Sequence, residues 1–126
     1  MSKSYQQFLK EQSGKTAVYT FGRFNPPTIG HEKLLRVVQT TSSKEGGDYF
    51  IYTSHSQDSK KNPLTHKQTI HFLKLIFPKY RPYIEDSLAK TALDAASEIH
   101  DKGGYTKLMM VVGSDRVSDF KSLLNR

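Results

Sequence analysis

The sequence predicts a three-layer α/β protein, in which a parallel β-sheet carries helices on both faces. Short apolar runs of strand-forming residues alternate with longer segments whose apolar residues recur at helical spacing. Glycine and proline residues separate these segments at intervals that suit strand-helix-strand units with right-handed crossovers. The 126 residues are enough for one domain with a single core.

Four segments predict the strands. Residues 16–21 (TAVYTF) and 49–53 (YFIYT) are short β-prone runs, and residues 107–112 (KLMMVV) are the strongest candidate for a buried strand. Residues 80–86 (YRPYIED) predict a short edge strand, because an edge strand tolerates Pro82, which has no N–H to donate.

Two helices are predicted in the first part of the chain. The first covers residues 29–41, where apolar side chains fall on one helical face before two glycines. The second begins with Thr65 and Gln68, which are spaced as a capping box, and ends before Pro78.

Two more helices are predicted toward the C-terminus. One has Ser87 as its N-terminal cap and ends at Gly103–Gly104, and the other starts near Asp115. Their expected core-facing residues are Leu88, Ala92, Ala96 and Ile99 in the first, and Val117, Phe120 and Leu124 in the second. Together with the strands, these helices predict a Rossmann-like sheet.

The chain divides into a short N-terminal segment and one domain. Residues 15–126 form the expected α/β domain. In residues 1–14, Tyr5, Phe8 and Leu9 have the spacing of a short amphipathic helix that could dock on the domain or on a partner.

Composition limits the classes of function. The net charge of +7 attracts phosphates, but the lysines are dispersed, so nucleic acid is not an expected partner. The absence of cysteine excludes disulfides, thiolate metal sites and a thiol nucleophile. We expect a cytoplasmic protein, because the N-terminus does not resemble a signal peptide and the longest apolar run, 108–112, is too short to span a membrane.

Polar segments follow three of the predicted strands. They are GRFNPPTIGH (22–31), SHSQDSKKNPLT (54–65) and GSDR (113–116). Ligands of open parallel sheets bind beyond the carboxyl ends of the strands. We therefore expect these three segments to meet at one edge of the sheet and to form the functional site.

The first of these segments has the properties of a phosphate site. Pro26 and Pro27 stiffen it, Thr28 is the predicted N-terminal cap of the following helix, and His31 falls in the first turn. The first turn of a helix leaves N–H groups unpaired at the positive end of the dipole, where an anion can bind. Gly30 has no side chain to block a phosphate, and His31 and Thr28 can each donate a hydrogen bond. The alternative is a stiff connection with a solvated histidine.

These segments also carry a family resemblance. GRFNPPTIGH resembles the signature of the nucleotidyltransferase superfamily named for its HxGH (often HIGH) motif. Its GRFxP opening is similar to that of archaeal-type nicotinamide mononucleotide adenylyltransferases, and its TxGH form, with Thr28 at the first histidine, to phosphopantetheine adenylyltransferases. SHSQDSKKNPLT resembles the SxxxSxxxNPFT region of the nicotinamide enzymes, with Leu64 in place of Phe. These segments also resemble, in general terms, those of cytidylyltransferase-like proteins of large phages.

The resemblance implies transfer of a nucleotidyl group, with adenylyl favoured over cytidylyl, from a nucleoside triphosphate to a small phosphorylated acceptor. Pyrophosphate leaves after direct in-line attack, and Mg²⁺ is expected with the triphosphate. His31 would stabilise the transition state, and Thr28 would take part of the missing histidine's role. The other implied contacts are Gly22, Arg23, Phe24, Gly30, Gly113, Ser114 and Asp115 with the nucleotide, and Asn62 and Thr65 with the acceptor.

One departure from the superfamily keeps two functions open. Its members usually continue into another strand and a Ser/Thr-containing motif that grips the triphosphate, whereas this sequence ends at Arg126 without one. An enzyme is favoured, and a nucleotide-binding or interaction protein on the same fold is the alternative. The oligomeric state is left open.

Other candidate sites are weaker. His66 and His71 are five residues apart on a predicted helix, so they face different sides and do not indicate a metal site. His55 and Asp58 can face substrate or solvent, and the pair Lys60–Lys61 can steer an anion or be solvated. The spacings of a Walker loop, a GxGxxG fingerprint and a GxSxG elbow are absent.

Overall fold

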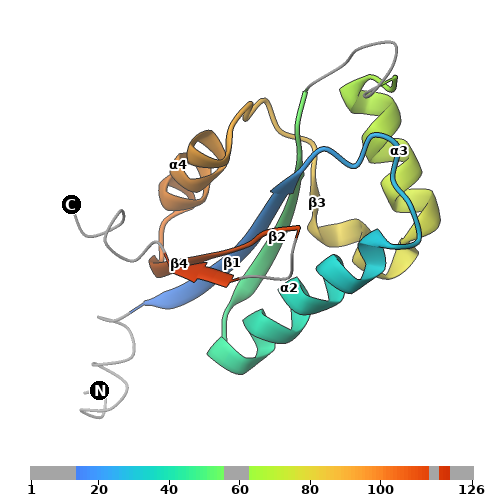
Figure 1. Ribbon diagram of the computed structural model, residues 1–126. Helices are drawn as coiled ribbons and strands as arrows, with labels where there is room; N and C mark the ends of the chain where they lie inside the picture. Colours follow the sequence, from blue (N-terminus) through green and yellow to red (C-terminus); the bar gives the residue numbers. More distant parts are fainter. Residues whose placement is uncertain (1–13, 56–62, 114–116, 120–126) are drawn as a thin grey trace, which may run out of the picture.

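The computed structural model describes residues 14–55, 63–113 and 117–119. They form a five-stranded sheet in the order β3-β2-β1-β4-β5, in which the first four strands are parallel and β5 runs antiparallel to β4 (Figure 1). The strands are β1 Lys15–Gly22, β2 Asp48–Thr53, β3 Ile84–Glu85, β4 Tyr105–Val111 and β5 Val117–Asp119. The helices are α2 His31–Glu45, α3 His66–Ile76 and α4 Ala92–Lys102, with a 3₁₀ helix, η1, at Pro78–Tyr83.

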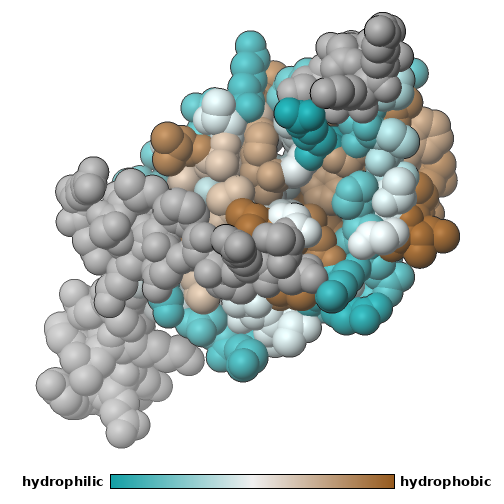
Figure 2. Space-filling view, viewed as in Figure 1, coloured by the Kyte–Doolittle hydropathy of each residue, from teal (hydrophilic) through white to brown (hydrophobic). Residues whose placement is uncertain are grey.

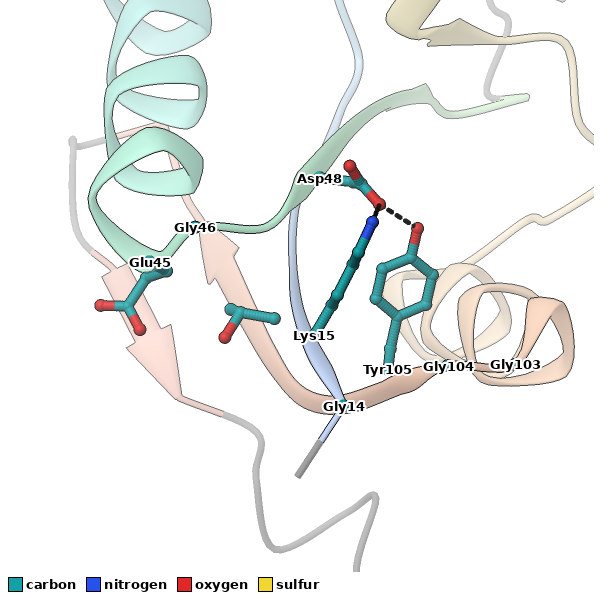
Figure 3. Close-up of a pocket in the computed structure, with 9 residues that line it drawn as sticks. Gly14, Lys15, Glu45, Gly46, Asp48, Gly103, Gly104 and Tyr105 are labelled. Atoms are coloured by element: carbon teal, nitrogen blue, oxygen red, sulfur yellow. Dashed lines mark hydrogen bonds and ion pairs between the residues drawn. The ribbon is translucent and has the colours of Figure 1, made fainter. Parts of the chain in front are cut away.

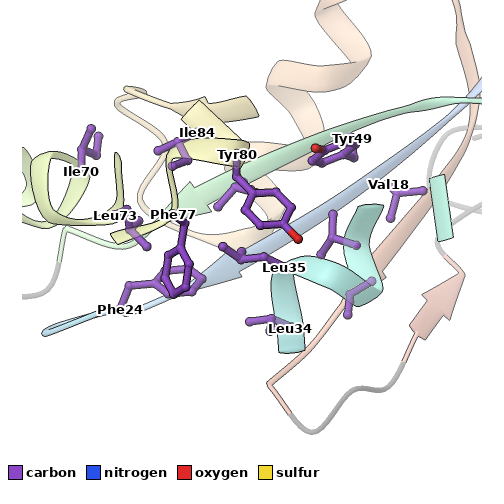
Figure 4. Packing of buried hydrophobic residues seen from close by; sticks show 13 residues of the cluster. Val18, Phe24, Leu34, Leu35, Tyr49, Ile70, Leu73, Phe77, Tyr80 and Ile84 are labelled. Atoms are coloured by element: carbon purple, nitrogen blue, oxygen red, sulfur yellow. The ribbon is translucent and has the colours of Figure 1, made fainter. Parts of the chain in front are cut away.

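Helices cover both faces of the sheet, so the predicted three-layer α/β fold is confirmed. On one face, side chains of α2 and α3 pack on the sheet in a core that includes Val18, Leu35 and Leu73 (Figure 4). On the other face, Ala95 and Ile99 of α4 are part of a second core cluster with Ala17, Tyr19, Tyr52 and Leu108. Successive residues of β1 thus serve opposite faces, as the pleat of a strand requires.

The local sequence signals that predicted α2 and α3 hold in the structure. Gly46, with a φ of 66°, ends α2 in the left-handed region that glycine adopts without strain. Thr65 and Gln68 form the reciprocal capping box at the start of α3. On the exposed side of α3, Phe72, Leu75 and Ile76 remain 39%, 53% and 40% accessible, and Figure 2 shows apolar surface gathered there.

Two predicted boundaries were wrong. The strand expected over residues 80–86 is reduced to β3, because Pro82 lies in η1, whose turns do not require its missing N–H. Ser87 does not cap α4. Its hydroxyl donates to the carboxylate of Glu98 at 2.9–3.0 Å, so the helix starts later, with Thr91 accepting from the Asp94 N–H at 3.0 Å.

The helix predicted from Asp115 was also wrong where the structure describes it. Val117–Asp119 is a strand, β5, and it pairs with the open edge of β4 through Val111 and Val117. Sheet pairing satisfies the edge of β4 and overrides the helical spacing of the apolar residues. Phe120 and Leu124 lie outside the described residues, as do residues 1–13 of the predicted N-terminal segment. Within the described part of the chain, none of the helices is long and apolar enough to cross a membrane.

Candidate functional site

The loop after β1 is shaped by the packing of Phe24 on Gly22. Phe24 has a positive φ of 45° and is buried, with 2% exposure, in the core between α2 and α3 (Figure 4). A Cβ atom at Gly22 would lie 2.9 Å from Cε2 of the Phe24 ring, so only glycine fits there without movement. The loop therefore turns sharply at the end of β1 while Arg23 stays exposed.

The same loop is tied to the end of β2 by two hydrogen bonds. The Thr53 hydroxyl donates to the Arg23 carbonyl at 3.1 Å, and the Ser54 N–H donates to the Gly22 carbonyl at 2.8 Å. On the other side of β1, the Thr20 hydroxyl donates to the Val111 carbonyl of β4 at 2.8 Å. Because β1, β2 and β4 are parallel, their carboxyl ends lie at one edge of the sheet, where the sequence predicted the site.

His31 is the first residue of α2, and its ring is held in place from two sides. Its Nδ1 accepts a hydrogen bond from the Thr28 N–H at 2.9 Å, and its ring packs edge-on against Phe24 with centroids 4.8 Å apart. Since a backbone N–H can only donate, Nδ1 carries no proton, and the neutral ring has its proton on Nε2. Burial lowers the pKa of His31, which favours this neutral form.

Thr28 was wrongly predicted as the helix cap. The N-cap is Gly30, which makes no side-chain capping bond, and Ile29 and Gly30 form a turn before the helix. In this turn the N–H groups of His31 and Glu32 donate to the carbonyls of Thr28 and Ile29, at 3.0 Å each. The side-chain donors that this turn offers to an anion are then His31 Nε2 and the exposed Thr28 hydroxyl, whose oxygen lies 3.3 Å from His31 Nδ1.

Gly30 leaves room beside these two donors. A Cβ built on it would have Thr28 Oγ1, at 3.7 Å, as its nearest neighbour, which is ordinary van der Waals contact. Packing therefore does not require glycine at position 30, whereas it does at position 22.

Asn25 connects the first loop to the residue before the N-cap of α3, and it was not singled out from the sequence. Its Nδ2 donates to the Leu64 carbonyl at 2.7 Å, and its Oδ1 accepts from the Leu64 N–H at 2.8 Å. A signal was present in retrospect, since the chain contains N-P-P-T at 25–28 and N-P-L-T at 62–65, each just before a helix with a histidine in its first turn.

The predicted acceptor residues are only partly described. The hydroxyl of Thr65 accepts from the Gln68 N–H at 3.2 Å, and this bond caps α3. The predicted residues Asn62, Ser114 and Asp115 lie outside the described residues, as do Asp58, Lys60 and Lys61. Gly113 lies two residues beyond the end of β4, at the same edge of the sheet.

Two histidines near this edge form a stack that the sequence analysis did not predict. The rings of His55 and His66 lie 3.7 Å apart with planes 12° from parallel. His55 Nε2 donates to the Ser87 carbonyl at 2.8 Å, and His66 Nε2 lies 3.6 Å from Oδ1 of Asp86. Burial and the neighbouring His55 lower the pKa of His66. His71 is exposed and does not join them. In the described residues no three His, Asp or Glu side chains are grouped to hold a metal.

A cavity of about 690 Å³ lies at the opposite edge of the sheet (Figure 3). It is lined by the first residues of β1, β2 and β4, together with Gly103 and Gly104. Within it the Tyr105 hydroxyl donates to Asp48 Oδ2 at 2.7 Å, and Lys15 Nζ lies 3.9 Å from the same oxygen. None of the sequence-predicted site residues that the structure describes lines this cavity.

The fold and the site together define a class of protein. A parallel sheet in the order β3-β2-β1-β4, with a T-x-G-H segment turning from β1 into the following helix, is an α/β domain of the HIGH-motif nucleotidyltransferase type. A family model described as cytidylyltransferase-like matches residues 19–125, and the chain belongs to this family. No curated protein and no solved structure matches the chain. The resemblance drawn from the sequence is thus confirmed at the level of the superfamily.

Proposed function

We propose that this chain is a nucleotidyltransferase that transfers an adenylyl group from ATP to a small phosphorylated acceptor. In this reaction an oxygen of the acceptor phosphate attacks the α-phosphorus and forms a new P–O bond. The bond between the α-phosphorus and the bridging oxygen breaks, and pyrophosphate leaves with the electron pair. Family membership supports nucleotidyl transfer, and adenylyl is chosen over cytidylyl because of the GRFxP opening.

The observation that carries the proposal is the orientation of His31. The Thr28 N–H fixes Nδ1 as an acceptor, so Nε2 is a donor in a ring that is already oriented by Phe24. A donor fixed before substrate binds costs no reorganisation when negative charge develops on the α-phosphate oxygens. We assign this stabilisation to His31 Nε2, with the Thr28 hydroxyl as a second donor.

The other predicted contacts extend from the same loop. Backbone groups of Gly22, Arg23 and Phe24, with Gly113, Ser114 and Asp115 after β4, are proposed to contact the nucleotide. Gly30 leaves space for the phosphate, and Asn62 and Thr65 are proposed to face the acceptor. Mg²⁺ would be bound through the triphosphate oxygens and water, as is usual for this ion, and would neutralise the charge of the triphosphate.

The test is a measurement of pyrophosphate release from ATP, CTP, GTP and UTP, each with a panel of small phosphorylated acceptors. Release from ATP with one acceptor is the expected result. Release only from CTP would correct the base, and binding of a nucleotide by calorimetry without any release would favour the non-catalytic alternative. Neither binding nor release with any triphosphate would contradict the proposal.

A further inference from the structure

We propose that Asn25 is a positioning residue that fixes the first turn of α3 against the His31 loop. This inference rests on the proposed function, since it concerns how the nucleotide and acceptor sides of that site are held together. Asn25 makes no contact with reacting atoms in this account and acts through Leu64 and Thr65.

The geometry of the contact supports this role. Asn25 uses both ends of its amide on the main chain of one residue, donating at 2.7 Å and accepting at 2.8 Å across 39 residues of sequence. The planar amide thereby imitates a neighbouring strand and restrains both the position and the orientation of Leu64. Asp would lose the donor, and Gln would place both atoms one methylene too far away.

The position of Asn25 in the chain gives the contact its consequence. Phe24, just before Asn25 in the sequence, anchors the loop in the core. Pro27, two residues after Asn25, is also buried and lies shortly before His31. Leu64 directly precedes Thr65, the cap of α3. The amide therefore links the two segments that the proposed function assigns to the α-phosphate and to the acceptor. In-line attack depends on their alignment, and a displacement of about 1 Å can lower a rate by about 10²-fold.

The experiment compares Asn25→Ala and Asn25→Asp with Thr53→Val. Thr53 supplies the matched control, because its hydroxyl also ties the loop to its neighbour but bonds to Arg23 rather than to Leu64. Amide hydrogen exchange at Leu64 is measured first, without substrate. We expect Asn25→Ala to exchange at least about 10-fold faster than wild type at Leu64. Asn25→Asp, which keeps an acceptor for the Leu64 N–H but loses the donor to the Leu64 carbonyl, should exchange there more slowly than Asn25→Ala, and Thr53→Val should exchange there like wild type.

Pyrophosphate release and ATP affinity are measured on the same variants. We expect Asn25→Ala to lower kcat by about 10²-fold, while the Kd for ATP, measured by calorimetry, changes less than about threefold. A purely structural role would lower stability without this split between kcat and Kd. Unchanged exchange at Leu64, or an unchanged kcat, overturns the inference. If wild type releases no pyrophosphate, the proposed function fails and the catalytic role of Asn25 fails with it, whereas the exchange data still decide whether Asn25 holds Leu64.

Discussion

Two glycines of the first loop should differ in how strongly substitution by alanine changes the stability of the protein. In Gly22→Ala the new Cβ would lie 2.9 Å from Cε2 and 3.2 Å from Cζ of Phe24, so the ring must move. Phe24 is 2% exposed and packs in the main core, where such movement displaces neighbours. In Gly30→Ala the nearest atom is Thr28 Oγ1 at 3.7 Å, and nothing has to move.

The magnitudes follow from these contacts. Overpacking of a core costs about 1–3 kcal/mol, and the reduced freedom of the unfolded chain returns about 0.4–1 kcal/mol when glycine becomes alanine. We therefore expect Gly22→Ala to lower the free energy of unfolding by about 1–2 kcal/mol, which in a chain of 126 residues corresponds to roughly 4–7 °C in Tm. Gly30→Ala should stay within about 1 kcal/mol of wild type.

The assay is thermal and urea unfolding of both variants, followed by ATP binding. Gly30→Ala should weaken ATP binding while leaving Tm nearly unchanged, because its methyl group stands where the phosphate is proposed to approach. Gly22→Ala should lower the free energy of unfolding less in a Phe24→Leu background than in wild type, because the smaller leucine side chain relieves the overlap with the new Cβ. Equal stability of the two single variants would refute the packing argument, and unchanged ATP affinity in Gly30→Ala would refute the placement of the phosphate.

Three other predictions concern stability and pH. Thr65→Ala should cost about 1 kcal/mol in urea unfolding, since it removes the cap of α3, and an unchanged midpoint would show that the capping box is not needed. Burial raises the pKa of Tyr19 to about 12, and its hydroxyl donates to the Ala92 carbonyl. The neutral form is thus favoured in the folded state, and it contributes roughly 3 kcal/mol to the free energy of unfolding below pH 10. This contribution should be lost as the pH rises toward 12. In Tyr19→Phe, the free energy of unfolding should fall less over the same pH range. Burial lowers the pKa of both His31 and His66, so the unfolded chain takes up these protons first and stability should fall as the pH drops below about 6.5. The double variant His31→Gln with His66→Gln should reduce that slope, and an identical slope would contradict the assignment.

Most of the fold could be predicted because its signals are local. The apolar runs of β1, β2 and β4 and the capping box at Thr65 depend only on neighbouring residues, and each was found in the structure. The segment at Val117 could not be predicted in this way, because its pairing with Val111 of β4 depends on a strand edge that helical spacing does not reveal. Serine is a common helix cap, but the hydroxyl of Ser87 donates its hydrogen bond to the carboxylate of Glu98, eleven residues further along the chain.

The site shows the same division. The position of His31 in the first turn of α2 followed from the proline-rich loop before it, and the structure confirms that position. The acceptor role of His31 Nδ1 depends on the geometry of the turn between Thr28 and His31. The contact of Asn25 with Leu64 and the stack of His55 on His66 join residues whose approach depends on the folded chain. Only the repeated N-P-x-T pattern hinted at the contact of Asn25 with Leu64.

The most direct test of the central claim is the rate of pyrophosphate release by wild type and by His31→Ala, measured with ATP and the acceptor found in the panel. Loss of one donor fixed at the developing charge costs about 10²–10³-fold in kcat. The account predicts a loss of that size with Tm and ATP affinity close to those of wild type, because the ring is half-buried and lies at the surface end of α2. A kcat equal to that of wild type would contradict it.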